Sequence, residues 1–186
     1  AWSREAKHYK QEHASEMAGT MFDIENYKKN WTPQQLENLM KYNHTILRVD
    51  NFGGEALTNP KVLEYLNMLV DAGVSQHITL YFNTNASTVP SEKWWTTLSK
   101  FKVLDFQLSL DGYKDQFEYQ RYPARWSEVE AFRKWIYQRS KEMPINYGII
   151  VTVNNFNVWY LPEIVEYFEK YKKLQALQNH PYYLGV

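Results

Sequence analysis

The chain has 186 residues, enough for one domain with a buried core, and its 21 lysines and arginines balance its 21 aspartates and glutamates. A neutral chain has no field of one sign that attracts nucleic acid or an acidic membrane surface, so we expect neither as a partner. No apolar run approaches the roughly 20 residues that span a bilayer, and residues 1–20 are too charged for the core of a signal peptide, which predicts a cytoplasmic protein.

The sequence contains no cysteine, which excludes disulfides, thiol nucleophiles and thiolate metal ligands from this chain. Its five histidines fit no metalloprotease pattern such as H-E-x-x-H. His8 and Glu12 stand four residues apart on an expected helix, but a solvated helix surface is the better interpretation, and we predict no metal site. The sequence begins at Ala1 rather than at a methionine, so we interpret it as a processed or incomplete chain.

The first 44 residues are expected to form a helical lead-in. Residues 1–18 are charged and helix-prone, with only a thin apolar stripe. Thr32 and Pro33 are typical of the N-cap and the first position of a helix, which we expect to continue to about Tyr42.

A strand, a turn and a helix follow, and this unit organises the rest of the chain. Residues 46–49 predict a strand, and residues 53–55 form a turn of two glycines and a glutamate. Asn59 with Pro60 opens an amphipathic helix that Gly73 closes. Adjacent glycines can bring bare backbone N–H groups close to a ligand, although a tight turn between strand and helix explains them equally well.

The same unit repeats along residues 45–175. Strands are expected at residues 77–82, 103–110 and 147–153, and helices at residues 92–101, 126–140 and 158–174. Residues 176–186 contain the start of a further strand. Strands that alternate with helices predict parallel strands joined by right-handed crossovers, so we expect an α/β fold in which residues 1–186 form a single domain.

The alternation of side chains along the strands distinguishes two α/β architectures. Along residues 103–111 one face is apolar, and the other face carries Asp105, Gln107, Ser109 and Asp111. A doubly wound sheet has helices on both faces and nearly continuous apolar strands, which these are not. We therefore predict a partial (β/α) barrel of parallel strands with a polar concave side, which lacks its first strand and its C-terminal end. Polar residues that simply face solvent are the alternative.

Polar residues and glycines also gather at the predicted carboxyl ends of the strands, the edge at which α/β proteins bind ligands. They are Gly53, Gly54, Glu55, Asn83, Thr84, Asn85, Ser109, Asp111, Gly112, Asn154 and Asn155. Their hydroxyls, amides and carboxylates suit a polar ligand that carries ammonium, carboxylate and ribose groups. The sequence shows no obvious nucleophile–base pair, and a bound cofactor is the better source of chemistry. Glu55 and Asp111 could also form a glycosidase-like pair of carboxylates.

Four of these segments, in this order, resemble motifs of the radical S-adenosylmethionine (radical SAM) enzymes, especially the group with a twitch-type extension for an auxiliary cluster. Residues 53–56 (G-G-E-A) resemble the GGEP motif, and residues 82–86 (F-N-T-N-A) resemble the F-x-T-N-G end of the third strand. Residues 108–112 (L-S-L-D-G) resemble the S-[LI]-D-G end of the fourth strand. Residues 151–155 resemble the fifth strand, and Arg121 matches an arginine often found beyond the fourth.

The resemblance implies a function. An intact enzyme of this family uses an electron donor and a [4Fe-4S] cluster to cleave S-adenosylmethionine reductively to a 5′-deoxyadenosyl radical, which abstracts hydrogen from a peptide or small-molecule substrate. The residues implied in cofactor binding are Gly53, Gly54, Glu55, Asn83, Asn85, Ser109, Asp111, Arg121, Thr152 and Asn154. The candidates for substrate contact, or for structural hydrogen bonds deeper in the barrel, are Arg48, Tyr81, Asp105 and Gln107.

The chain departs from the family where the chemistry begins. The family holds its cluster on a Cys-x3-Cys-x2-Cys loop after its first strand, and we find neither that strand nor a cysteine. We therefore expect the chain to be the central part of such a domain and inactive by itself. Ala56 and Ala86 replace a proline and a glycine of the motifs, which affects local turn geometry. Two alternatives remain: a non-catalytic barrel without a cluster that binds a ligand or peptide, and a barrel hydrolase that uses Glu55 and Asp111.

Overall fold

The computed structural model describes residues 32–176 and 182–185, and the chain divides into two units, Ala1–Lys41 and Tyr42–Val186. The described part of the first unit is helix α3, Pro33–Met40. Thr32 forms a capping box with Gln35, in which each side chain accepts a hydrogen bond from the other residue's backbone N–H. This confirms the predicted helix start. The helix expected over residues 1–18, with His8 and Glu12, lies outside the described residues.

The second unit contains a sheet of five strands, all parallel, whose order in space is their order in the chain. The strands are β1 Arg48–Asn51, β2 Thr79–Thr84, β3 Val103–Ser109, β4 Ile145–Ile150 and β5 Tyr182–Gly185. The α/β class expected from the sequence is therefore confirmed. The strand expected within residues 176–186 is confirmed at β5.

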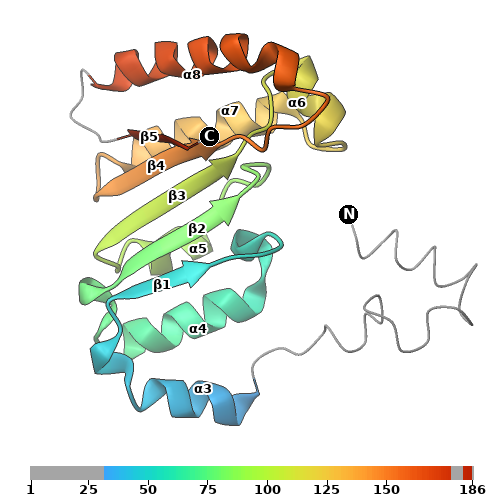
Figure 1. The fold of residues 1–186 in the computed structure, drawn as a ribbon. Helices are drawn as coiled ribbons and strands as arrows, with labels where there is room; N and C mark the ends of the chain where they lie inside the picture. The colour runs from blue at the N-terminus through green and yellow to red at the C-terminus, as the bar shows by residue number, and fades with distance from the viewer. Residues whose placement is uncertain (1–31, 177–181, 186) are drawn as a thin grey trace, which may run out of the picture. The chain divides into compact units, whose positions relative to one another are not determined.

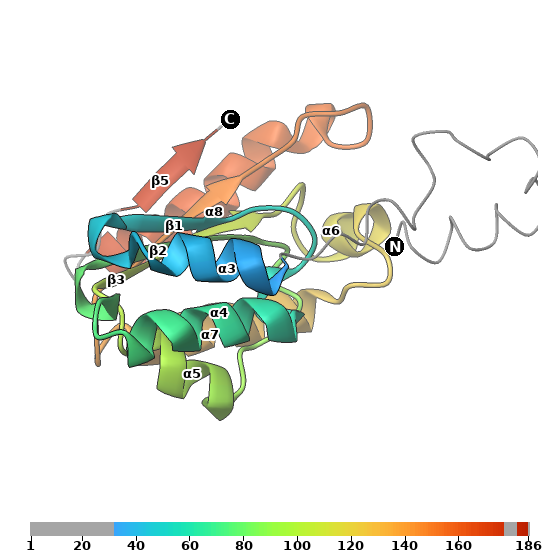
Figure 2. The same ribbon diagram turned by 90° about the horizontal axis from the view of Figure 1, so that it is seen from below.

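Helices connect the strands, and in Figure 2 the helices labelled α4, α5 and α7 lie below strands β1 to β3, on one side of the sheet (Figures 1 and 2). The α-helices of this unit are α4 Pro60–Asp71, α5 Glu92–Leu98, α6 Asp115–Gln120, α7 Trp126–Arg139 and α8 Leu161–Ala176. Single 3-10 turns occur at Asn43–Thr45, Ala56–Thr58, Ser75–His77 and Val158–Tyr160. Along the described residues, no helix combines the length and the apolar character needed to cross a membrane.

Helix α4 has the start and the end that the sequence predicts. The Asn59 side chain accepts a hydrogen bond from the Lys61 N–H at 3.0 Å, and Pro60 occupies the first helical position. Gly73, just past the end, has a φ of 72°, a left-handed conformation that costs glycine little. The buried side of the helix carries three leucines: Leu63, Leu66 and Leu69.

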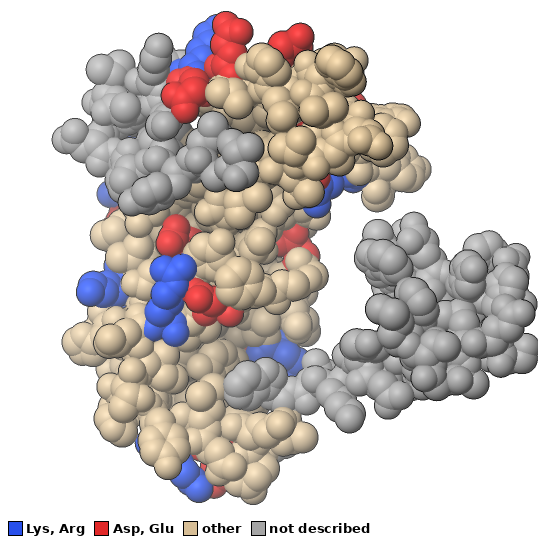
Figure 3. Space-filling view, viewed as in Figure 1, with Lys and Arg blue, Asp and Glu red and all other residues tan. Residues whose placement is uncertain are grey.

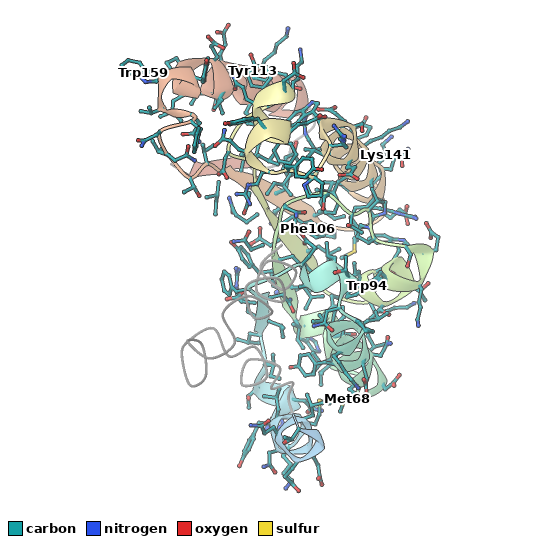
Figure 4. The ribbon with its side chains drawn as sticks, turned by 90° about the vertical axis from the view of Figure 1, so that its right-hand side faces the viewer. Met68, Trp94, Phe106, Tyr113, Lys141 and Trp159 are labelled. Carbon is teal, nitrogen blue, oxygen red and sulfur yellow. The ribbon has the colours of Figure 1, made fainter. Side chains whose placement is uncertain are left out.

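The core lies between the helices and the apolar face of the sheet. Alternation along β3 is as expected, because the side chains of Leu104, Phe106 and Leu108 are buried while their neighbours are half-exposed. Phe106 (labelled in Figure 4) is the centre of an aromatic cluster: its ring centroid lies 5.6 Å from those of Phe82 and Phe132. The apolar face therefore packs against helices.

Several predicted boundaries are wrong in detail. The first two strands were expected at residues 46–49 and 77–82, but each begins and ends two residues later, at β1 and β2. The β-branched runs mark where strand propensity is high, whereas the ends of a strand depend on where it pairs, here from Arg48 opposite Thr79. The fourth strand begins two residues earlier than expected, and the loop expected after residue 112 contains the short helix α6.

Truncating the centre of the aromatic cluster tests this core. We expect Phe106→Ala to lower the free energy of unfolding by about 3–5 kcal/mol, because it removes a fully buried ring from between the sheet and helix α7. Urea unfolding followed by circular dichroism measures the change. Trp159→Ala removes an aromatic ring that is 86% exposed and is the matched control, with an expected loss below about 0.5 kcal/mol. Equal losses in the two variants would contradict this assignment of the core.

Candidate functional site

The residues expected to bind a ligand follow the carboxyl ends of four neighbouring strands. Because β1 to β4 are parallel and adjacent, the turns that follow them lie along the same edge of the sheet (Figure 1). Parallel α/β sheets bind ligands at this edge. The polar open face of the sheet leads up to it, so the edge and the open face form one candidate site.

The turn after β1 depends on its two glycines. Gly53 has a φ of 81° and Gly54 a φ of 58°, so both residues lie in the left-handed region that favours glycine. Both are exposed, and a Cβ built on either residue would meet no atom within 4 Å. Glycine is therefore required here by backbone conformation, and the space at the Cβ position of both residues is open.

Glu55 links this turn to the turn after β2. Its Oε2 accepts a hydrogen bond from the Asn85 N–H at 3.1 Å. Its Oε1 is buried and accepts no hydrogen bond from any described residue. Burial raises the pKa of the Glu55 carboxyl, while the Thr84 side chain and the Asn85 N–H act in the opposite direction. One carboxylate oxygen at the edge is thus left for a donor that the described residues do not supply.

The turn after β2 is held by short polar contacts. The Ser109 hydroxyl, at the end of β3, donates to Asn83 Oδ1 at 2.7 Å. Asn85 Oδ1 accepts from the Ser87 N–H at 2.9 Å, which closes an Asx turn. Ala86 has a φ of 57°, so the turn keeps a left-handed residue at the position where the resembled motif has glycine. The departure at Ala86 leaves the turn geometry in place at the cost of backbone strain.

Asp111 ties three segments together. Its side chain is 10% exposed: Oδ2 accepts from Arg121 Nε at 2.7 Å and lies 2.5 Å from Arg121 Nη2, while Oδ1 accepts from the Thr152 N–H at 2.8 Å. Both oxygens of the Asp111 carboxylate accept hydrogen bonds. Of the three guanidinium nitrogens of Arg121, Nη1 is the one without a contact to Asp111. The carboxylate therefore fixes the residues after β3, helix α6 and the residues after β4 to one another, and a direct contact of Asp111 with a ligand stays a prediction.

Asn157 is a positioning residue that the sequence did not reveal. It is fully buried, and its Nδ2 donates to the backbone oxygens of Asp111 and Thr152 at 2.9 Å each. Its Oδ1 accepts from the Asn154 N–H at 2.8 Å, while Asn154 Nδ2 donates to Gln120 Oε1 at 3.1 Å. The repeated asparagines of residues 154–157 were the available signal. Asn154, expected to contact the cofactor, is at least in part a structural residue of this loop.

On the open face, the four residues proposed for substrate contact fall into three neighbouring rows: Arg48 lies in the first, Tyr81 and Asp105 in the second, and Gln107 in the third. Arg48 Nε donates to Asp50 Oδ1 at 2.6 Å, its Nη1 lies 3.6 Å from Asp105 Oδ2, and its guanidinium lies 4.9 Å from the centre of the Tyr81 ring. Gln107 stands opposite Asn83 in the next row. Figure 3 shows charges of both signs together on this face. Burial raises the pKa of Asp105, against the influence of Arg48, and burial together with the Asp105 charge raises the pKa of Tyr81.

Exposed aromatic side chains border the same edge beyond β3 and β4, and the sequence analysis did not single them out. Tyr119 on α6 and Phe156 meet edge to face, with ring centroids 5.8 Å apart. Trp159, labelled in Figure 4, is among the most exposed apolar residues of the described chain. Abundant aromatics in the sequence pointed to packing, so exposure could be recognised only in the structure.

The side chains that are available as ligands determine which cofactors the chain could hold. Within residues 32–176 and 182–185, no group of three or more His, Cys, Asp or Glu side chains could hold a metal ion. A [4Fe-4S] cluster needs thiolates, and the sequence has no cysteine, so the residues of this chain do not fit that group. A ligand with an ammonium group fits better, because Glu55 Oε1 is an acceptor without a hydrogen-bond partner among the described residues.

No protein-family model matches the chain, and a search of curated proteins gives no match either.

Replacing the buried Asp111 carboxylate tests whether its hydrogen bonds hold the three segments together. We expect Asp111→Asn to lower the free energy of unfolding by about 1–3 kcal/mol. Arg121 and the Thr152 N–H are both hydrogen-bond donors, and the NH2 group of the asparagine would face one of them and leave that donor without an acceptor. Urea unfolding measures the loss. Glu64→Gln breaks the exposed pair with Lys61 and is the control, with an expected change below about 0.5 kcal/mol. An Asp111→Asn variant as stable as this control would contradict the assignment.

The raised pKa of Glu55 predicts a pH dependence. Above its ordinary value of 4.5, the folded protein keeps a proton that the unfolded chain releases, so the free energy of unfolding falls as pH rises through the raised pKa. Glu55→Gln removes this titration. We therefore expect the stability of the variant relative to the wild type to increase with pH from about 4.5 to neutrality, measured by urea unfolding at several pH values. A difference that is constant or decreases with pH would contradict the assignment.

Proposed function

We propose that the chain is the central part of a radical SAM domain, a partial (β/α) barrel whose open face and carboxyl edge bind S-adenosylmethionine. The observation that carries the proposal is the sequential order of the five parallel strands, with α4, α5 and α7 on one face. This arrangement brings all four segments that resemble the family's motifs to one edge, beside the polar face of the sheet.

The sheet topology favours a partial barrel over a doubly wound sheet. In a doubly wound sheet the strand order reverses at a switch point, and helices cover both faces. Here each strand is added beside the previous one in the same direction, as around a barrel. The half-exposed polar residues of β2 and β3 lie on the side that a barrel turns inward.

The chemistry of the turns suits the parts of the cofactor. The N–H groups of Gly53 and Gly54 would approach the methionyl end, and the free oxygen of Glu55 would accept from its ammonium group. Arg121 Nη1, the nitrogen that Asp111 does not engage, would pair with the methionyl carboxylate. The sugar and base would then lie toward the hydroxyl and amide groups of Ser109, Asn83, Asn85, Thr152 and Asn154.

This chain by itself is proposed to bind the cofactor and not to turn it over. In an intact radical SAM domain, the cluster and an electron donor supply the electron that cleaves the cofactor, and the chain has no thiolate to hold that cluster. In the intact protein a peptide or small-molecule substrate would lie on the open face, against Arg48, Tyr81, Asp105 and Gln107.

One alternative has a specific observation in its favour. A non-catalytic barrel that binds a ligand or peptide agrees with the complete absence of cysteine. The barrel hydrolase has less support, because both carboxylate oxygens of Asp111 are engaged with Arg121 and Thr152 and are poorly placed for attack or proton transfer.

A binding experiment with two matched glycine variants tests the proposal. We expect saturable binding of S-adenosylmethionine to the purified chain by isothermal titration calorimetry, and binding weakened by about ten-fold in Gly54→Ala. Gly73→Ala is the control, because Gly73 is also a left-handed glycine with open space at its Cβ, but lies at the opposite edge of the sheet. The control should lose similar stability and keep its affinity.

The outcomes separate the hypotheses. Absence of binding at millimolar S-adenosylmethionine would overturn the proposed function. Equal binding of adenosine and S-adenosylmethionine would remove the role of the glycine turn and favour the ligand-binding alternative. An equal loss of affinity in both glycine variants would show that the turn after β1 is not part of the site.

A further inference from the structure

Four residues at the carboxyl edge of the sheet form a closed ring of hydrogen bonds. Gln120, the last residue of α6, donates from Nε2 to the Asp111 carbonyl oxygen at 3.2 Å, and the same oxygen accepts from Asn157 Nδ2 at 2.9 Å. Asn154 closes the ring, because its N–H donates to Asn157 Oδ1 at 2.8 Å and its Nδ2 donates to Gln120 Oε1 at 3.1 Å. The ring joins the end of α6 to the residues after β3 and the residues after β4.

The ring fixes the orientation of two amide side chains. A carbonyl oxygen can only accept, so the NH2 groups of Gln120 and Asn157 both face Asp111. The side-chain oxygens of the two residues then face Asn154, which meets them with two N–H donors. Turning either amide over would place donor against donor and acceptor against acceptor. The ring therefore has one arrangement in which each donor has an acceptor.

Helix α6 depends on contacts of this kind. It has six residues, too few for a helix to be stable by itself. Phe117 anchors its buried side, with its ring centroid 5.5 Å from that of Trp126 on α7. Gln120 anchors its C-terminal end through the ring. Arg121 follows directly, so Gln120 holds the backbone from which the Arg121 side chain reaches the Asp111 carboxylate.

We propose that Gln120 is a positioning residue, which holds Arg121 at a fixed distance from the loop after β4. The inference rests on the proposed function, in which Arg121 Nη1 binds the methionyl carboxylate while Thr152 and Asn154 lie near the sugar and base. A ligand that spans both groups binds more tightly when their separation is fixed before it arrives. Without the Gln120 amide, Asn157 would still hold the loop, but the segment that carries Arg121 would be less restrained.

Two leucine variants on one helix test this role. Gln120→Leu removes both hydrogen bonds with little change in side-chain size. Gln116→Leu is the matched control, one turn earlier on α6, because Gln116 Oε1 is buried and accepts no hydrogen bond from the described residues. By isothermal titration calorimetry, we expect Gln120→Leu to bind S-adenosylmethionine about five-fold more weakly than the wild type. Its affinity for adenosine, which has no carboxylate for Arg121, should change by less than about two-fold. The control should keep both affinities.

A second measurement needs no ligand. The Arg121 Nε–H donates to Asp111 Oδ2 at 2.7 Å, so its exchange with water is slow for as long as this contact persists. Exchange of this proton, followed by heteronuclear NMR of the purified chain, should be about five-fold faster in Gln120→Leu and unchanged in Gln116→Leu. A Gln120 side chain that only fills space would leave the exchange rate unchanged on replacement by leucine.

The outcomes separate this inference from the proposed function. If the wild type binds S-adenosylmethionine and Gln120→Leu matches it in affinity and in Arg121 exchange, Gln120 has no positioning role and the proposed function stands. If the wild type does not bind, the proposed function fails, and Arg121 exchange alone decides: faster exchange in Gln120→Leu supports the positioning role, and unchanged exchange overturns it. Equal losses in Gln120→Leu and Gln116→Leu, or for adenosine and S-adenosylmethionine, would show a general loosening of α6 and would also overturn it.

Discussion

Each crossover in this sheet adds the next strand on the same side of the one before it, and the rest of the structure follows from that constraint. Crossovers between parallel strands are right-handed, so a series that always advances in one direction places every connecting helix on one face. The other face is left without a helix, and its side chains must be compatible with water. Strand β3 shows the result, with Phe106 buried in the helix-side core and Asp105 half-exposed on the open side.

The same constraint gathers polar groups at one edge of the sheet, where the turns need hydrogen-bond partners from within the protein. The carboxyl ends of neighbouring parallel strands carry turns whose backbone groups lack partners in the sheet. Asp111 and Asn157 supply many of those partners, binding Arg121, the Thr152 N–H and the backbone oxygens around them. The polar groups at the edge near β3 and β4 therefore find most of their hydrogen-bond partners within the protein. The turn after β1 differs, since Glu55 retains an oxygen without a hydrogen-bond partner among the described residues.

How much of this was predictable depends on whether the signal is local. The alternation along residues 103–111 and the Asn59–Pro60 start of α4 are local patterns, and both predicted the structure correctly. The limits of β1 and β2 depend on pairing between distant residues, and there local propensity was wrong by two positions. The site shows the same division: the sequence predicts that Asp111 and Arg121 belong to one edge, but not that they bind each other.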